Sequence, residues 1–229
     1  MRIAYRERLD AFAHDLIIMC DMVGEIMGEA SDALLRASLE SAEAALSRRE
    51  ALDEVRVRCT DLAVELLALE GPVAGDLRQI ISSIYIVEDF DRMAALAMHI
   101  ARTARDHHPE QALPGELMGH FEEYVRLVRD MTAKTRDLLV RPDADVAVKL
   151  AREDDGVDEL DRQILSLLTR QEWAHSTRAA VDAALLSRYY ERYADHCVGV
   201  AARIVYLTTG LRPAEYLRRQ AEGHDRDWT

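Results

Sequence analysis

Four carboxylates on two helical segments have a spacing that suits a metal site. Glu191 and Asp195 lie in the segment RYYERYADHCVGVAARIV, and Asp154 and Asp158 precede them with the same spacing. A separation of four residues places both members of a pair on one side of a helix, one turn apart. If the two helices pack together, the four carboxylates can converge. Such oxygen ligands suit Mg²⁺, Mn²⁺, Ca²⁺ or iron better than zinc.

The position of Glu191 creates a need for positive charge. This residue falls on the three-four stripe of its segment, so it should face the interior with Asp195 beside it. Two carboxylates in a partly desolvated place cost on the order of several kcal/mol unless a cation or a proton neutralises them. A metal ion is one remedy. The other is a solvated acidic ridge with salt bridges to Arg188 and Arg192.

The elements that must position these carboxylates are long helices. Apolar residues recur at spacings of three and four, and turn signals at residues 71–72, 109–115, 142 and 210–213 separate such stretches. No segment alternates with a period of two, so we expect an all-α fold. The expected helices are at residues 3–36, 38–70, 73–107, 116–140, 143–171 and 176–209.

The chain also repeats itself. Residues 91–102, DRMAALAMHIAR, align with residues 191–202, ERYADHCVGVAA, and the same offset pairs Arg78 with Arg178. EALDEV at 50–55 likewise aligns with DGVDEL at 155–160. We therefore expect two three-helix bundles. They should cover residues 1–110 and 111–212, followed by a charged, frayed tail at 213–229.

Composition and charge exclude several classes of function. With 42 acidic and 29 basic residues, the net charge of −13 opposes binding to nucleic acid or to anionic lipid. Cysteines are few and widely spaced, and no run approaches the length of a membrane span or a signal peptide. We expect a cytoplasmic protein without membrane insertion. No phosphate-binding loop or nucleophile motif indicates an enzyme.

Two stretches carry a family resemblance. GPVAGDLRQI at 71–80 and ERYADHC at 191–197, together with the helical repeat, resemble the PhoU family of phosphate-signalling regulators, and especially its actinobacterial, PhoY-like members. The resemblance implies two pseudo-twofold-related three-helix bundles that bind metal ions through paired E/D-x-x-x-D motifs. The metal would be a divalent or ferric ion such as Fe, Mn, Mg or Zn.

The resemblance also implies a function. It is that of a non-enzymatic negative regulator of the phosphate-starvation response, which couples a phosphate-specific ABC transporter to a sensor histidine kinase and modulates phosphate uptake. The implied partners are the ATPase subunit of the transporter, the kinase and a second copy of the chain. Arg78 and Arg178 are candidate partner contacts. The structural alternative for Arg78 is a salt bridge to Asp76 or to a neighbouring helix.

The two halves should differ in their capacity for metal. The repeat places Asp91 and Ala95 where the second half has Glu191 and Asp195. It also places Arg49 and Asp53 where the second half has Asp154 and Asp158. Only Asp53 and Asp91 remain as ligands in the first half. Because affinity for hard cations depends on ligand charge and number, we expect one competent site, in the second half.

Two other functions remain open from the residues. The first is a metal-handling or metal-dependent helical bundle whose chemistry resides at the second-half carboxylates. Glu172 and His175 have the spacing found in di-iron bundles, although no second motif of this kind accompanies them. The remaining alternative is a scaffold that only dimerises.

Overall fold

The computed structural model describes residues 2–69, 72, 74–170 and 172–226, and within these ranges it contains helices and no strand. The first half comprises α1 (Arg2–Arg36), α2 (Leu39–Ser47), α3 (Arg49–Leu69) and α4 (Ala74–His107). A short 3₁₀ helix, η1 (Gly115–Leu117), leads into the second half, which comprises α5 (Met118–Val140), α6 (Ala144–Leu168) and α7 (Thr177–Thr209). A last helix, α8 (Pro213–Arg226), follows.

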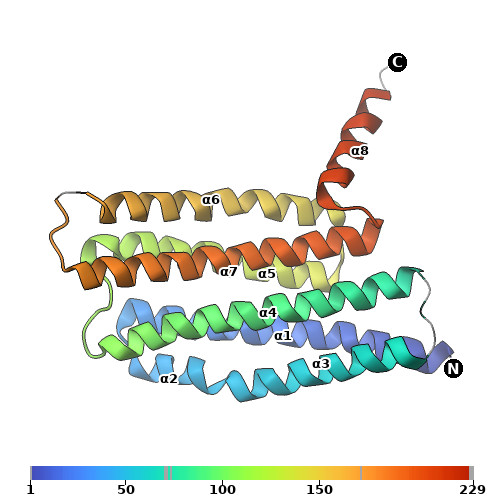
Figure 1. The fold of residues 1–229 in the computed structure, drawn as a ribbon, viewed down its shortest axis with the longest axis horizontal. Helices are drawn as coiled ribbons and strands as arrows, with labels where there is room; N and C mark the ends of the chain where they lie inside the picture. The colour runs from blue at the N-terminus through green and yellow to red at the C-terminus, as the bar shows by residue number, and fades with distance from the viewer. Residues whose placement is uncertain (1, 70–71, 73, 171, 227–229) are drawn as a thin grey trace.

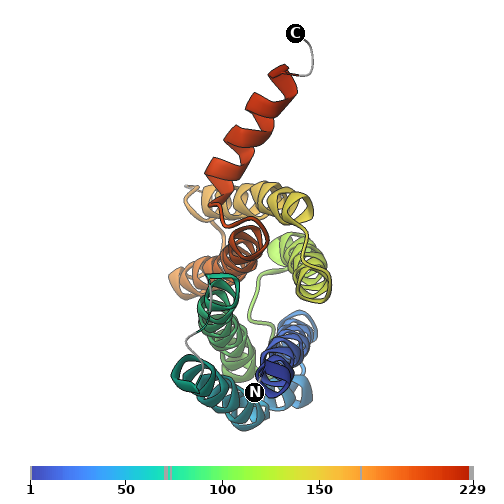
Figure 2. The ribbon, with the colours of Figure 1, turned by 90° about the vertical axis from the view of Figure 1, so that its right-hand side faces the viewer.

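The helices form two three-helix bundles stacked on each other. α2 and α3 together act as the second helix of the first bundle (Figure 1). α4 and α7 lie side by side between the bundles and pack extensively, and α1 and α5 meet on the other side of this interface (Figure 2). The predicted fold class is therefore confirmed: the chain is all-α, with two bundles related by a pseudo-twofold axis.

Local chemistry accounts for several helix ends. The Asp143 side chain accepts hydrogen bonds from the backbone N–H groups of residues 145 and 146, and Ser176 accepts one from the N–H of Ala179. These are N-caps that satisfy otherwise unpaired donors of α6 and α7. Gly210 ends α7 with φ of 73°, a left-handed conformation that glycine adopts without steric cost.

Two expectations about the elements were wrong. The helix expected at 38–70 is interrupted at Arg48, whose guanidinium reaches back to α1 and pairs with Glu25 and Glu29. The tail is not frayed from Pro213 onward, because residues as far as Arg226 form α8, which projects from the end of the second bundle (Figure 1). Residues 227–229 lie outside the described part of the chain.

Buried tyrosines join the helices of the second bundle to each other and to α1. Tyr124 and Tyr190 stack with their ring centroids 5.3 Å apart. The Tyr190 hydroxyl lies 3.0 Å from Ser31 of α1, which places a buried hydrogen bond across the two bundles. The Tyr193 hydroxyl lies 3.0 Å from Thr132 Oγ1. These buried rings stabilise the second bundle and its contact with α1, and their hydroxyls are paired rather than left unsatisfied.

None of the helices in the described residues is long and apolar enough to cross a membrane.

Candidate metal centre

The packing of α6 against α7 brings the second-half carboxylates into one neighbourhood. Glu191 is 7% exposed, as its place on the apolar stripe predicts, and Asp154 is half-buried. Asp158 and Asp195 are exposed. The expectation that Asp195 points inward with Glu191 was therefore wrong. The cluster has one deeply buried carboxylate and a solvent-facing rim.

The proximity of the carboxylates shifts the pKa values of Asp154 and Glu191, the two that are less exposed. Burial, followed by the charges of Asp195, Asp158 and Glu191, raises the pKa of Asp154 to about 6. Burial and the Asp195 carboxylate also raise the pKa of Glu191, while Arg188 opposes that rise. Each carboxylate thus makes ionisation of its neighbours less favourable, which is the behaviour of like charges held together at a partly desolvated site.

Positive charge within the chain compensates this cluster only in part. Arg188 Nη1 lies 2.5 Å from Glu191 Oε1. Glu191 Oε2 and Asp154 Oδ1 are buried without a hydrogen-bond partner. A buried carboxylate oxygen without a donor is costly, so these two atoms are suited to a proton or a cation.

The side chains do not yet form a coordination shell. Over the described ranges, no three His, Cys, Asp or Glu side chains converge in an arrangement that could hold a metal ion. Since Asp158 and Asp195 are exposed, rotation of their side chains would be needed to bring their oxygens to a cation near Asp154 and Glu191. The donor set fits a hard cation in its chemistry and charge, but its geometry is open.

Asp161 is an acidic neighbour that the sequence analysis missed. Its Oδ1 accepts a hydrogen bond of 2.6 Å from Ser187 Oγ, and Ser187 lies 2.8 Å from the Tyr124 hydroxyl. The Asp161 charge also raises the pKa of Glu191. The signal that could have found it is its spacing of three residues from Asp158, which puts both on one side of α6. Asp161 thereby connects the cluster to the tyrosines of the bundle core.

Histidines near the cluster are occupied elsewhere. His196 Nδ1 lies 2.9 Å from Asp89 Oδ1 of α4, so this histidine contributes to the contact between the bundles. His175 precedes α7 and lies 3.4 Å from Glu116, and Glu172 lies in a turn before α7. A di-iron motif requires both residues on one helix, and Glu172 and His175 do not lie on one.

In the first half, arginines occupy the equivalent place. Arg49 Nη2 lies 2.8 Å from Asp53 Oδ1 and 2.9 Å from Asp91 Oδ1. Arg56 Nε approaches the same two carboxylates at 3.3 and 3.8 Å. By the repeat alignment, Arg49 and Arg56 stand where α6 has Asp154 and Asp161. The two remaining carboxylates are thus neutralised by the chain itself.

The candidate partner-contact arginines lie near opposite ends of the α4–α7 pair. Arg78 follows the start of α4 and is half-buried; its guanidinium lies near Gly210, the C-cap of α7, and its Nε has no hydrogen-bond partner. Arg178 follows the start of α7, is largely exposed, and lies 3.7 Å from Asp182. Arg178 is thus exposed to solvent beside Asp182, whereas Arg78 is half-buried against the end of α7.

Comparisons with known proteins agree with this architecture. The family model described as PhoU domain matches residues 16–104 and 121–204, one match in each bundle. The chain belongs to the PhoU family. It is 43% identical over 213 residues to the "phosphate-specific transport system accessory protein PhoU homolog 2" of Mycobacterium tuberculosis, an alignment that covers 93% of this chain and 100% of the relative.

Other PhoU proteins extend the likeness. The homolog 1 protein of Mycobacterium leprae is 42% identical over 215 residues, covering 94% of this chain and 97% of that relative. The crystal structure of PhoU from Pseudomonas aeruginosa matches with a TM-score of 0.82 at 24% identity and covers 90% of this chain and 100% of that one. PhoU from Streptococcus pneumoniae matches with a TM-score of 0.80. The actinobacterial type of the family is therefore confirmed by sequence, and the fold by structure.

Proposed function

We propose that the protein is a cytoplasmic, non-enzymatic regulator that restrains the phosphate-starvation response. In this role it binds the ATPase subunit of a phosphate-specific ABC transporter and a sensor histidine kinase, and it acts as a homodimer. The observation that carries the proposal is the alignment over nearly the whole chain with mycobacterial proteins named as accessory to phosphate-specific transport. The conformation of the transporter would bias which partner is bound, because the protein would have different affinities for the different transporter conformations.

We further propose that one hard cation binds between α6 and α7. Asp154, Asp158, Glu191 and Asp195 would hold it, and the unpartnered oxygens of Asp154 and Glu191 support this assignment. Fe, Mn, Mg and Zn ions are candidates, of which the hard, oxygen-preferring ions suit four carboxylates best. The cation would neutralise the cluster and fix α6 against α7, so its role in this proposal is to rigidify the second bundle.

The function is tested by expression of a phosphate-starvation gene in phosphate-rich medium. We expect derepression when the gene for this protein is deleted and repression again when the wild-type gene is restored. Complementation with Glu191→Ala/Asp195→Ala reports whether the acidic cluster is needed. The matched control is Glu122→Ala/Asp137→Ala, which removes two exposed carboxylates from α5. Unchanged expression in a deletion strain that also lacks any paralogue would refute the proposal.

Partner binding is tested separately by co-purification. We expect the tagged protein to recover the transporter ATPase and the histidine kinase, with proportions that depend on phosphate supply. Arg178→Ala should weaken recovery if this exposed guanidinium contacts a partner, while Arg102→Ala, an exposed arginine on α4, serves as its control. Recovery of neither partner at either phosphate level would contradict the proposed coupling.

A metal-handling function is the alternative, and the two buried carboxylate oxygens without partners favour it. Under that alternative, purified protein loads iron stoichiometrically and supports redox turnover, and deletion leaves phosphate-starvation genes unchanged. The regulator proposal expects the opposite pattern.

A further inference from the structure

A groove between α1 and α5 lies outside the acidic cluster. It has a volume of about 390 Å³, within the range of sites for small organic ligands. Its walls are largely apolar, and the helices that form it belong to different bundles (Figure 2). The lining includes Gly24, Met27 and Gly28 of α1 and Val125, Val128 and Thr132 of α5.

Most charged groups on the rim of this groove are already paired. Asp21 accepts from Arg136 at 2.5 Å, which joins α1 to α5. Glu25 pairs with Arg48 at 2.7 Å. Paired charges of this kind are largely neutralised for a ligand that approaches the groove.

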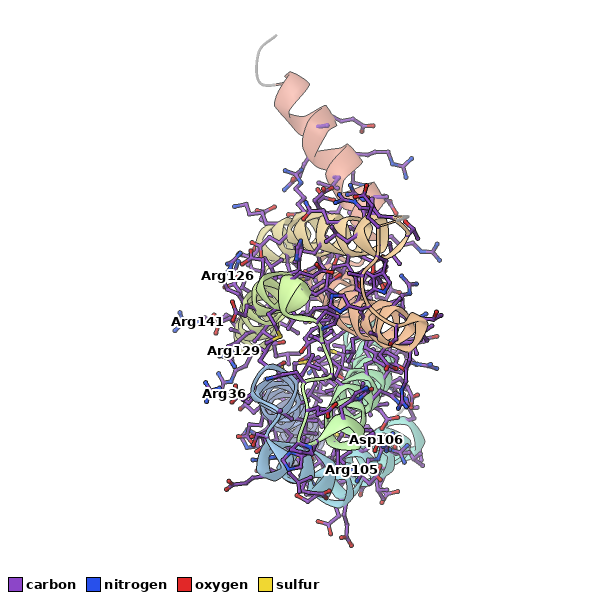
Figure 3. The ribbon with its side chains drawn as sticks, turned by 90° about the vertical axis from the view of Figure 1, so that its left-hand side faces the viewer. Arg36, Arg105, Asp106, Arg126, Arg129 and Arg141 are labelled. Carbon is purple, nitrogen blue, oxygen red and sulfur yellow. The ribbon has the colours of Figure 1, made fainter. Side chains whose placement is uncertain are left out.

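Arg129 is the exception. Among the described residues, no carboxylate lies within ion-pair distance of its guanidinium, although Arg126 on the same helix pairs with Glu123. Arg129 is exposed. Burial raises the pKa of Tyr190, and the Arg129 charge opposes that rise. The Tyr190 hydroxyl lies 3.0 Å from Ser31, which lines the groove. Figure 3 labels Arg126 and Arg129 on α5 and Arg36 on α1, all on the side of the molecule where these helices lie. The groove thus combines apolar walls with one uncompensated positive charge.

Gly28 keeps space open beneath this charge. A Cβ at Gly28 would meet only Arg129 Nη2, at 4.0 Å, whereas a Cβ at Gly24 would lie 3.3 Å from Thr132 Cγ2. Close helix packing therefore accounts for Gly24 but not for Gly28. Glycine within a helix is destabilising relative to alanine. At Gly28 no close contact between helices offsets this cost.

We propose that the α1–α5 groove binds a small amphipathic anion, whose apolar body fills the groove and whose anionic head pairs with Arg129. The class comprises small aromatic or aliphatic molecules that carry a sulfonate, phosphate or carboxylate group. An arginine guanidinium suits such heads because it offers several donors in one plane. Since α1 and α5 belong to different bundles, a bound anion would hold the two bundles together on this side.

The test uses anilinonaphthalene sulfonate as an anionic probe and N-phenylnaphthylamine as its uncharged counterpart. We expect the purified full chain to bind one sulfonate probe in a saturable manner. Arg129→Gln should weaken this binding about tenfold, the effect of one charge-assisted contact, and leave the uncharged probe unaffected. The matched control Arg126→Gln removes an exposed arginine of the same helix outside the groove and should change neither probe.

A second variant tests the space itself. Gly28→Leu should abolish binding of both probes because its side chain fills the groove. Gly119→Leu, with no atom within 4 Å of its added Cβ, is the control and should bind as wild type does. Circular dichroism melting would establish that each variant is folded. Unaltered sulfonate binding in folded Gly28→Leu protein, or no saturable binding by wild type, would overturn the proposal.

Discussion

Arg49 Nη2 lies 2.9 Å from Asp91 Oδ1, and Arg49 stands at the repeat position that Asp154 holds in the second bundle. The same guanidinium lies 2.8 Å from Asp53. In the first bundle, therefore, a fixed cation of the chain neutralises the two carboxylates that the repeat has retained. In the second bundle the equivalent position carries a further negative charge. The two halves share a fold but differ in how their carboxylates are neutralised. In the first half an arginine of the chain does so, whereas in the second half the protonation of Asp154 depends on pH.

Replacing Arg49 with alanine should destabilise the protein by about 1 kcal/mol or less. Asp53 and Asp91 would keep only the longer contacts to Arg56, and their partial exposure limits the effect through solvent screening. Urea denaturation at low and high salt measures it, and the difference should shrink as salt rises. Arg102→Ala, which removes an exposed arginine of α4, should have no comparable effect. An equal loss in that control would show that the Arg49 pairings are not responsible.

The double variant Arg49→Asp/Ala95→Asp should acquire a cation site in the first bundle. These changes restore at α3 and α4 the carboxylate pattern that α6 and α7 carry, and affinity for hard cations rises with the number of anionic ligands. Equilibrium dialysis with Mn²⁺ should show one more ion per chain than wild type. Arg49→Ala/Ala95→Ser is the control without new carboxylates. If the double variant folds and binds no additional ion, Arg49 is not the feature that separates the halves.

Much of this architecture was predictable because local chemistry and tertiary structure agree. Gly210 and the N-caps Asp143 and Ser176 coincide with helix ends, and the apolar stripe that contains Glu191 is the buried face of α7. The repeat was visible because its two halves pack alike, so equivalent positions carry similar residue types. The resemblance to the PhoU family rested on two short stretches, and the full-chain comparisons confirm it.

Other features depend on contacts that sequence spacing does not contain. The break at Arg48 coincides with ion pairs to α1, a helix remote in the chain. α8 was missed because its many charges suggested a frayed end, yet Tyr216 anchors it by donating to Asp145 of α6 at 2.8 Å. Asp195 was expected to face the interior because it lies one helical turn after Glu191. Four residues exceed one full turn of 3.6 residues, and in the structure Asp195 lies on the exposed edge of α7.

The hydrogen bonds from Asp161 through Ser187 to Tyr124 make an ordered pair of predictions. Tyr124→Phe removes one buried hydrogen bond and should reduce the free energy of unfolding by about 1 kcal/mol. Ser187→Ala leaves the buried Tyr124 hydroxyl without its partner and should cost more, about 1–3 kcal/mol. Denaturant unfolding of both variants measures the order. A smaller loss for Ser187→Ala would mean that water or another group replaces its hydroxyl.

Removal of α8 should leave the bundles intact. A chain ending at Arg212 loses only peripheral contacts to α7 and α6, so its free energy of unfolding should change by less than about 0.5 kcal/mol. Gly210→Ala is the informative comparison, because a φ of 73° is unfavourable for alanine and should cost about 1 kcal/mol. Thermal and urea unfolding of the two variants would distinguish the roles of the cap and the helix. A large loss in the truncated chain would show that α8 is part of the cooperative fold.

The acidic cluster should make stability depend on pH with a defined sign. Burial and neighbouring charges raise the pKa of Asp154 from 3.8 to about 6 in the folded protein. Below the lower value the group is protonated in both states. Between about pH 4 and pH 6 the unfolded chain loses this proton while the folded chain retains it, so the contribution of Asp154 to stability falls as pH rises.

In metal-free protein, Asp154→Asn should remove this contribution. Its stability relative to wild type should therefore increase from pH 4 to pH 7, measured by urea unfolding at each pH. Glu122→Gln, which changes an exposed carboxylate of α5, is the control. Addition of Mn²⁺ at pH 7 should stabilise wild type by mass action and the variant much less. The effect on wild type should weaken towards pH 5, because protons compete with the cation for the same carboxylates. A Mn²⁺ effect that is equal at both pH values, or equal in the two proteins, would place the cation away from Asp154.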